Sequence, residues 1–334
     1  MIDVVELTRS LVEIPSVTGD EKAVGEFLFD FLQDQGWVCD RQEVAADRFN
    51  VVARRGSPEI ILSTHMDTVP PFFGFREDEE FVYGRGACDA KGIIATMICA
   101  AEELLAEGKT DLGLLFVVGE ETDSSGAKKA RDLDLECSFV IDGEPTDNEL
   151  VVGHKGMIYA RIQTTGITAH SAYPEQGESA IDKLLDILAK LRALEFPHDA
   201  RLGETYVNVG TIRGGRAPNV IPDAAEAEVL IRTVTSSARY VEILQGLSPG
   251  RDVLEVVATS EPQVMESVEG FPTKVVGYGT DVPSLRSLGK PLLVGPGSIL
   301  EAHTAQEKVA KQELRDAIAV YKQLIGLLKN SPGS

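Results

Sequence analysis

Residues 59–70 read EIILSTHMDTVP, a continuous apolar run that ends in a histidine and an aspartate. A short apolar run of this kind predicts a strand that is buried on both faces. Similar runs occur at 50–53, 112–118, 138–141 and 291–294. Residues 91–107 have the length and apolar content of a helix, and two amphipathic helices are predicted at the start of the chain. Buried strands alternating with helices predict an α/β fold, a mostly parallel sheet with helices on both faces.

The middle of the chain has a different pattern. Residues 157–165 alternate between apolar and polar side chains, which is typical of a strand with one buried face. A helix with apolar residues between 181 and 191 follows it. The remaining elements expected here are strands at 206–211, 225–231 and 253–259 and a short helix at 238–247. The order strand-helix-strand-strand-helix-strand is that of a ferredoxin-like α+β domain.

The length of 334 residues also favours two domains, because a single hydrophobic core rarely grows this large. The ferredoxin-like pattern lies between two parts of the sheet-forming sequence. We therefore expect a discontinuous catalytic domain, residues 1–155 and 263–334, with an inserted domain at residues 156–262.

The composition argues against two classes of partner. A formal net charge of -21 disfavours binding to nucleic acid or to an anionic membrane surface. The four cysteines show no CxxC pairing, and no apolar stretch is long enough to span a bilayer. The N-terminus carries an early acid, Asp3, and lacks a basic segment followed by an apolar core. These features predict a cytoplasmic protein with neither nucleic acid nor membrane as a partner.

Polar side chains follow the predicted strands. His65 and Asp67 come after 59–63, Glu120 and Glu121 after 112–118, Glu144 after 138–141, and His303 after 291–294, while Asp89 precedes the helix at 91–107. The carboxyl ends of parallel strands share one edge of the sheet, where ligands bind. Loops are polar in any case, but four that each carry histidine or acid favour a functional site. Two imidazoles and several carboxylates suit a pair of divalent metal ions.

Five segments carry a resemblance to a known family. They are HMD at 65–67, GRGACDAKG at 84–92, GEET at 119–122, GEPT at 143–146 and the segment around His303. In order and spacing they resemble the motifs of the M20 family of dinuclear-zinc peptidases and deacylases. That family includes acetylornithine deacetylase, succinyl-diaminopimelate desuccinylase and glutamate carboxypeptidases. The resemblance spans essentially the whole chain.

The resemblance implies a set of metal ligands. Asp89 would bridge two ions, His65 and Glu144 would complete one site, and Glu121 and His303 would complete the other. The implied cofactors are two divalent metal ions, taken as Zn²⁺, with Co²⁺ or Mn²⁺ as alternatives. Asp142 is an alternative ligand to Glu144.

The resemblance also implies catalytic roles beside the metals. Asp67 would hold the second ring nitrogen of His65 and fix its tautomer. Glu120 would be the general base, which takes a proton from water and delivers it to the leaving amine. A solvated loop acid is the alternative interpretation of Glu120. The family further implies a cis peptide bond between Asp89 and Ala90.

The inserted domain resembles the lid and dimerisation domain of the same family. His170 resembles a lid histidine that polarises the scissile carbonyl from the partner subunit. Asn219 and Arg232 resemble lid residues that bind the carboxylate of the substrate. Gly297 and Ser298 resemble the floor beside the substrate's α-carboxylate. The alternatives are a surface histidine, a surface charge at the end of a strand and a simple tight turn.

The resemblance implies a zinc-dependent hydrolase of linear amide bonds that acts on a small N-acyl amino acid as a homodimer. The segment GPGS at 295–298 and the context of His303 favour an acetylornithine deacetylase, which would place the protein in arginine biosynthesis. The same site could serve a succinyl-diaminopimelate desuccinylase, a carboxypeptidase or dipeptidase, or a hydrolase of a carrier-protein-linked amino acid. A non-catalytic binder of amino-acid derivatives is a further alternative, but it would be expected to lack a ligand or Glu120.

Overall fold

A computed structural model describes residues 2–135, 137–247 and 253–329 of the chain. The chain divides into two compact units. Unit 1 comprises Met1–Val152, Met265–Lys274 and Thr280–Ser334, and unit 2 comprises Gly153–Val264 and Val275–Gly279. The segments of unit 1 are thus separated by unit 2 in the sequence. None of the helices in the described part of the chain is long and apolar enough to cross a membrane.

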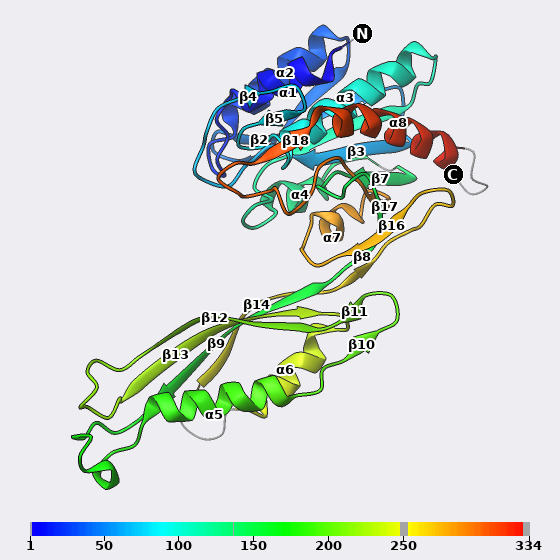
Figure 1. Cartoon of the computed structure of the whole chain (residues 1–334). Helices are drawn as coiled ribbons and strands as arrows, with labels where there is room; N and C mark the ends of the chain where they lie inside the picture. Colours follow the sequence, from blue (N-terminus) through cyan, green and yellow to red (C-terminus); the bar gives the residue numbers. More distant parts are fainter. Residues whose placement is uncertain (1, 136, 248–252, 330–334) are drawn as a thin grey trace. The chain divides into compact units, whose positions relative to one another are not determined.

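Unit 1 is built on a sheet of strands in the order β1-β2-β6-β3-β7-β17 (Figure 1). Their bounds are β1 (Val38–Ala45), β2 (Arg48–Arg55), β3 (Ile60–His65), β6 (Leu112–Val117), β7 (Phe139–Asp142) and β17 (Lys290–Leu293). Strands β6, β3, β7 and β17 run parallel, and every residue of β3, β6 and β7 is buried. The predicted parallel core is confirmed. At one edge, however, β1 and β2 pair antiparallel, so the whole sheet is mixed.

Helices cover both faces of this sheet. Alternate residues of a strand point to opposite faces, and Ile60 and Leu62 belong to one apolar cluster while Ile61 belongs to another. The first cluster includes side chains of α1 (Val4–Val12), α2 (Lys22–Asp34), α3 (Lys91–Ala106) and α8 (Lys311–Leu328). The second includes side chains of α4 (Ser125–Ala130) and α7 (Val282–Leu285). The predicted α/β architecture is therefore confirmed, with α8 as an element that the sequence analysis missed.

Two smaller sheets of three strands each are also present. One contains β4 (Arg76–Glu77), β5 (Phe81–Tyr83) and β18 (Lys308–Ala310). The other contains β8 (Leu150–His154), β15 (Gln263–Val264) and β16 (Thr273–Val276). The division between the two units falls within the strands of this second sheet, because β8 is split after Val152 and β16 after Lys274.

Unit 2 is a four-stranded antiparallel sheet with two helices packed on one face (Figure 1). In chain order its main elements are β9 (Gly156–Thr165), α5 (Ala180–Ala193), β12 (Tyr206–Gly214), β13 (Ala224–Thr233), α6 (Ser237–Gln245) and β14 (Val253–Ser260). The spatial order β12-β13-β9-β14 is that of a ferredoxin-like fold. Short elements are η1 (Pro174–Gln176), β10 (His198–Asp199) and β11 (Gly203–Glu204). The buried residues Ile158, Ala160 and Ile162 alternate along β9, so one face of the sheet meets the helices.

Candidate metal centre and active site

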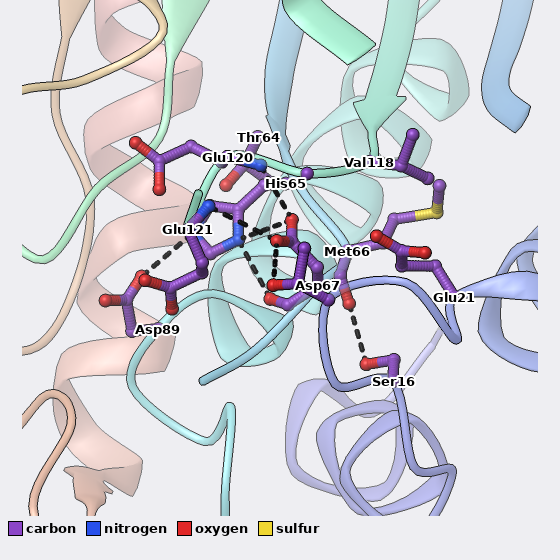
Figure 2. Close-up of polar contacts among 12 residues, drawn as sticks. Ser16, Glu21, Thr64, His65, Met66, Asp67, Asp89, Val118, Glu120 and Glu121 are labelled. Atoms are coloured by element: carbon purple, nitrogen blue, oxygen red, sulfur yellow. Dashed lines mark hydrogen bonds and ion pairs between the residues drawn. The ribbon is translucent and has the colours of Figure 1, made fainter. Parts of the chain in front are cut away.

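The ends of the parallel strands bring the predicted ligands of unit 1 together. His65 is the last residue of β3, and Glu120 and Glu121 lie in the loop that follows β6. Glu144 follows β7, and Asp89 lies two residues before α3. Figure 2 shows His65, Asp67, Asp89, Glu120 and Glu121 close together, with Asp67 at one nitrogen of the His65 ring and Asp89 at the other. The sheet topology thus places the side chains as the strand-end rule predicts.

Asp89 lies between the two histidines. Its Oδ1 atom is 2.9 Å from His65 Nε2, and its Oδ2 atom is 3.3 Å from His303 Nε2. His303 Nε2 is also 2.9 Å from Glu121 Oε2. Each oxygen of one buried carboxylate therefore faces a different imidazole, which is the arrangement that a bridging ligand requires. The peptide bond after Asp89 is cis, as the resemblance implied.

Two groups of side chains could each hold an ion. His65, Asp89 and Glu121 form one group, and His65, Glu120 and Glu144 form the other, with the ligand atoms of each group within 4.8 Å of one another. Glu144 is buried, and a Cβ on Gly295 would lie 2.5 Å from its carbonyl oxygen, so glycine is needed there. Asp142, the alternative to Glu144, is buried as well.

Asp67 has more contacts than its proposed role required. The Nδ1 atom of His65 lies 2.9 Å from the backbone carbonyl of Asp67 and 3.5 Å from its carboxylate, so the carbonyl is the closer hydrogen-bond partner. The carboxylate instead accepts hydrogen bonds from the backbone N–H groups of Glu120 and Glu121, at 3.0 and 3.2 Å, and from the Thr18 hydroxyl at 2.7 Å. Asp67 thus contacts His65 and also holds the loop after β6 that carries Glu120 and Glu121 (Figure 2).

The electrostatics of the site reflect many acids in a small volume. Burial raises the pKa of Glu144 well above its usual value, and the neighbouring Glu120 and Asp89 raise it further. Burial likewise raises the pKa of Glu120, although His65 works in the opposite direction. Hydrogen bonds to Asp89 and Glu121 raise the pKa of His303 to about 10. Burial therefore favours the protonated forms of Glu120 and Glu144 unless positive charge lies close to them, and the acids around His303 favour positive charge at that position.

The donor set fits divalent metal ions. Imidazole nitrogens and carboxylate oxygens within a few ångströms are ligands that Zn²⁺ and related ions accept. Buried carboxylates at such density are costly unless they are protonated or paired with positive charge. Of the side chains that act on the pKa of Glu144, three are acids and one is an imidazole. Two divalent cations would supply the missing positive charge, so the residues present fit the group that the motifs imply.

The segment 295–298 lies next to Glu144, one of the predicted metal ligands. Gly295 N–H donates to the Thr146 hydroxyl at 3.0 Å, and Ser298 forms an isolated antiparallel bridge with Thr146. Gly297 has a φ of +82°, and a Cβ there would lie 2.6 Å from Cys88 Sγ. Burial raises the pKa of the Cys88 thiol well above its usual value, so Cys88 is a packed thiol and not a reactive one.

The predicted site residues of unit 2 fall into two places. His170 and Asn219 lie side by side, because His170 bridges Val220 and the N–H of Ser171 donates to the Asn219 carbonyl at 3.0 Å. Both are exposed. Arg232 is half-buried near the other end of β13, eight residues beyond Ala224 and hence about 26 Å from the start of that strand. A single copy of unit 2 therefore does not bring Asn219 and Arg232 to the same carboxylate.

Two buried acids that the sequence analysis did not select also surround the site. Asp281, directly before α7, is 2% exposed, and burial raises its pKa to about 6. Glu307 is fully buried and accepts hydrogen bonds from the loop that carries Asp89. In the sequence, Asp281 stands before Val282-Pro283, a pattern that predicts the start of a helix. That pattern gave no indication that Asp281 lies near the site. Glu307 had no signal beyond its position four residues after His303.

The fold and the site together define a class: an α/β protein whose parallel strands carry a histidine and carboxylate centre for metal ions. A model of the family described as Peptidase family M20/M25/M40 matches residues 61–326. A peptidase M20 domain-containing protein of Schizosaccharomyces pombe is 39% identical, over 97% of this chain and 84% of its own length. A probable carboxypeptidase of Aspergillus clavatus is 38% identical, over 95% of this chain and 86% of its own length.

The architecture agrees with this relationship. The crystal structure of a tripeptidase from Staphylococcus aureus matches with a TM-score of 0.84 at 20% identity, covering 98% of both chains. The chain belongs to peptidase family M20/M25/M40 and is a metal-dependent hydrolase of amide bonds. The resemblance read from the five segments and the prediction of an enzyme are thereby confirmed.

Proposed function

We propose that the chain is a two-metal peptidase of the carboxypeptidase or dipeptidase type, which releases an amino acid from a short peptide. The observation that carries the proposal is Asp89, whose two oxygens face His65 and His303. We infer that His65 and Glu144 hold one ion with Asp89, and that Glu121 and His303 hold the other. Zn²⁺ fits this set of nitrogen and oxygen ligands, and Co²⁺ or Mn²⁺ are the alternatives. The preference for peptides is supported by relatives named as probable carboxypeptidases.

Hydrolysis of an amide bond at this site would require bound divalent ions, a water molecule and the carboxylate of Glu120. Divalent ions, when bound, polarise a carbonyl and lower the pKa of water near them. Glu120 takes the proton of the attacking water as the water oxygen bonds to the scissile carbonyl carbon. As the C–N bond breaks, Glu120 returns that proton to the leaving amine. General acid–base catalysis of this kind contributes about 10²- to 10⁴-fold in rate.

The raised pKa of Glu120 suits this role, because a base must hold the proton between two steps. Its backbone N–H is fixed by Asp67, which keeps the base beside the ligand Glu121. Glu120 also lies within reach of His65 and Glu144 as a possible ligand. Replacement of Glu120 by glutamine distinguishes the two roles. If Glu120 is the base, the variant retains both metal ions. If Glu120 is a metal ligand, the variant loses one of them.

The positions of His170, Asn219 and Arg232 support a site shared between two copies of the chain. His170 and Asn219 lie at one end of unit 2 and Arg232 at the other. If all three contact one substrate, they come from two subunits, as the predicted homodimer requires. Mixing His170→Ala with Glu120→Gln protein should then restore part of the turnover that each variant lacks alone. Absence of any recovery in mixed dimers would contradict the shared site.

A second candidate function is removal of an acyl group from an amino acid, as in acetylornithine deacetylase. The segment 295–298 favours it, because it resembles the acetylornithine deacetylase pattern and because Gly295 and Ser298 contact Thr146, two residues after Glu144. The two candidates share the ligands and Glu120, and they differ in what occupies the substrate site on either side of the amide.

The test is a substrate panel with Zn²⁺- and Co²⁺-loaded protein. It contains N-acetylated dipeptides, free dipeptides and tripeptides, N-acetylornithine and succinyl-diaminopimelate. Release of the C-terminal amino acid from peptides supports the first proposal, and faster cleavage of N-acetylornithine supports the second. No turnover of any substrate, with two bound ions shown by elemental analysis, would refute both. Glu120→Gln should retain both ions and lose about 10²- to 10⁴-fold in kcat.

A further inference from the structure

The buried carboxylate of Glu307 accepts four hydrogen bonds. Its Oε1 atom accepts from the backbone N–H groups of Gly86, Cys88 and Asp89, at 2.9, 3.1 and 3.0 Å. Its Oε2 atom accepts from Arg85 Nη1 at 2.5 Å. Three backbone donors on one oxygen fix the path of the turn from residue 86 to residue 89. The side chain that this turn presents to the two histidines is Asp89.

The guanidinium of Arg85 completes the arrangement. Arg85 is 2% exposed and Glu307 is fully buried, so the pair has almost no contact with water. Arg85 Nε also donates to the carbonyl of Pro71 at 3.2 Å, and the guanidinium lies over the Phe73 ring. Removing one partner of a buried ion pair strongly destabilises the folded protein, because the other charge is left buried without a partner. The carboxylate is therefore held in one place from both sides.

Glu307 is also tied to the segment that carries His303. It lies four residues after His303 in the same loop, and its own carbonyl accepts from the Gly84 N–H at 3.1 Å. His303 has a φ of +61°, a left-handed conformation that a side chain adopts only when its surroundings enforce it. One residue thus joins the Asp89 turn to the His303 loop through both its side chain and its backbone.

We propose that Glu307 is a positioning residue that sets the separation of Asp89 and His303 and thereby the affinity for the ion that they hold with Glu121. The inference rests on the proposed two-metal site. The ion of His303 and Glu121 depends on both segments that Glu307 joins. Of these two segments, the ion of His65 and Glu144 depends only on the one that carries Asp89. Loss of the Glu307 contacts should therefore weaken the first ion more than the second.

Glutamine at 307 tests this directly. Its amide has one acceptor oxygen, so it either keeps the backbone N–H groups and turns an N–H toward Arg85, or does the reverse. Glu307→Gln should bind one Co²⁺ ion nearly as the wild type does and the other about 10- to 100-fold more weakly, as for other residues that orient metal ligands. Arg85→Lys keeps the positive charge and the backbone bonds, and should show a smaller loss at the same ion.

The measurement is calorimetric titration of metal-free protein with CoCl₂, with the visible absorption of bound Co²⁺ as a second readout. A general loss of stability would not change the absorption bands of the ions that remain bound, whereas a displaced ligand would. Glu301→Gln is the matched control, because Glu301 lies in the same loop and is partly exposed, with Lys308 as an ion-pair partner at 4.0 Å. Its titration and spectrum should equal those of the wild type.

The outcomes separate this inference from the proposed function. If the wild type binds two Co²⁺ ions and both Glu307→Gln and Arg85→Lys bind two with wild-type affinity and spectrum, the positioning role is wrong and the two-metal site stands. If the wild type itself binds no Co²⁺, the two-metal site is wrong and the inference fails with it. If Glu307→Gln does not fold, Arg85→Lys decides: a weakened ion supports the role and unchanged binding overturns it.

Discussion

Replacing Asp67 with asparagine is expected to damage the site through the backbone of the ligand loop. The Asp67 carboxylate accepts from Thr18 and from the N–H groups of Glu120 and Glu121, using both oxygens. Asparagine has one acceptor oxygen, and its NH₂ group must face at least one of these donors. The variant therefore loses at least one hydrogen bond to a charged acceptor and leaves a partly buried N–H without a partner.

The size of the effect follows from these contacts. A hydrogen bond to a charged group is worth about 1.5–3 kcal/mol, and the unsatisfied N–H adds about 1 kcal/mol or more. We expect unit 1 to lose about 3 kcal/mol of unfolding free energy, or roughly 6–12 °C in Tm for a unit of this size. Because the loop that carries Glu120 and Glu121 is held less firmly, kcat should fall about 10- to 100-fold.

The assay compares kcat, metal content and thermal unfolding of Asp67→Asn with those of the wild type. Asp123→Asn is the control, since Asp123 is an exposed acid in the same loop and accepts from Ser125 N–H at 3.0 Å. It should change kcat by less than about twofold, as exposed substitutions usually do. A kcat and Tm for Asp67→Asn equal to those of the control would refute the argument that this carboxylate holds the loop.

Two further predictions concern Asp281 and Gly295. The folded pKa of Asp281 is raised from 3.8 to about 6, so the native metal-free protein binds more protons than the unfolded chain between these values. Its stability should then fall on the order of 3 kcal/mol as the pH rises from about 4 to about 6, and Asp281→Asn should remove that part of the decline in urea unfolding. Gly295→Ala should displace Glu144, because the new Cβ would meet the Glu144 carbonyl at 2.5 Å, and should weaken metal binding in calorimetric titration.

The prediction for Gly295→Ala has a control within the chain. Gly326 lies in α8 with nothing within 4 Å of a Cβ position, so Gly326→Ala should leave metal binding unchanged and raise stability by up to about 1 kcal/mol. Normal metal affinity in Gly295→Ala would show that Glu144 tolerates the movement. For Asp281→Asn, a decline in stability between pH 4 and 6 as steep as in the wild type would assign that decline to other groups.

Much of unit 1 was predictable because its buried strands are short apolar segments that can be recognised in the local sequence. The observed strands β3, β6, β7 and β17 begin and end within about two residues of the predicted ones, since each is a short apolar run between polar turns. Helix α8 carried a signal that was missed, because Leu314, Tyr321 and Leu328 have helical spacing and are buried. The sequence of the antiparallel strand β1 carried almost no signal for its position in the sheet. It is an edge strand with largely exposed polar residues, and its direction depends on a neighbour that local sequence does not specify.

The predicted metal ligands and the positioning residues also differ in how far local sequence predicts them. His65, Asp67 and Glu120 follow apolar strands closely, so the topology of the sheet predicts where they meet. Glu307 acts on residues more than 200 positions away in the chain, through backbone N–H groups that have no sequence identity. Asp281 lies beside Glu120 only because the α7 segment packs on the second face of the sheet. Contacts of this kind depend on the assembled fold, and no local pattern encodes them.

The donors around each buried acid separate the acids by role. Asp67 and Glu307 are surrounded by N–H and O–H donors, so their lone pairs are occupied and their charge is already compensated. Such a carboxylate positions other groups and has few lone pairs left for a metal ion, although burial raises the pKa of Glu307 as it raises those of Glu120 and Glu144. Glu144 and Glu120 have other acids and His65 as their main electrostatic neighbours, and burial raises their pKa values. A carboxylate in that situation binds a cation or a proton, and these are the roles that the mechanism assigns to Glu144 and Glu120.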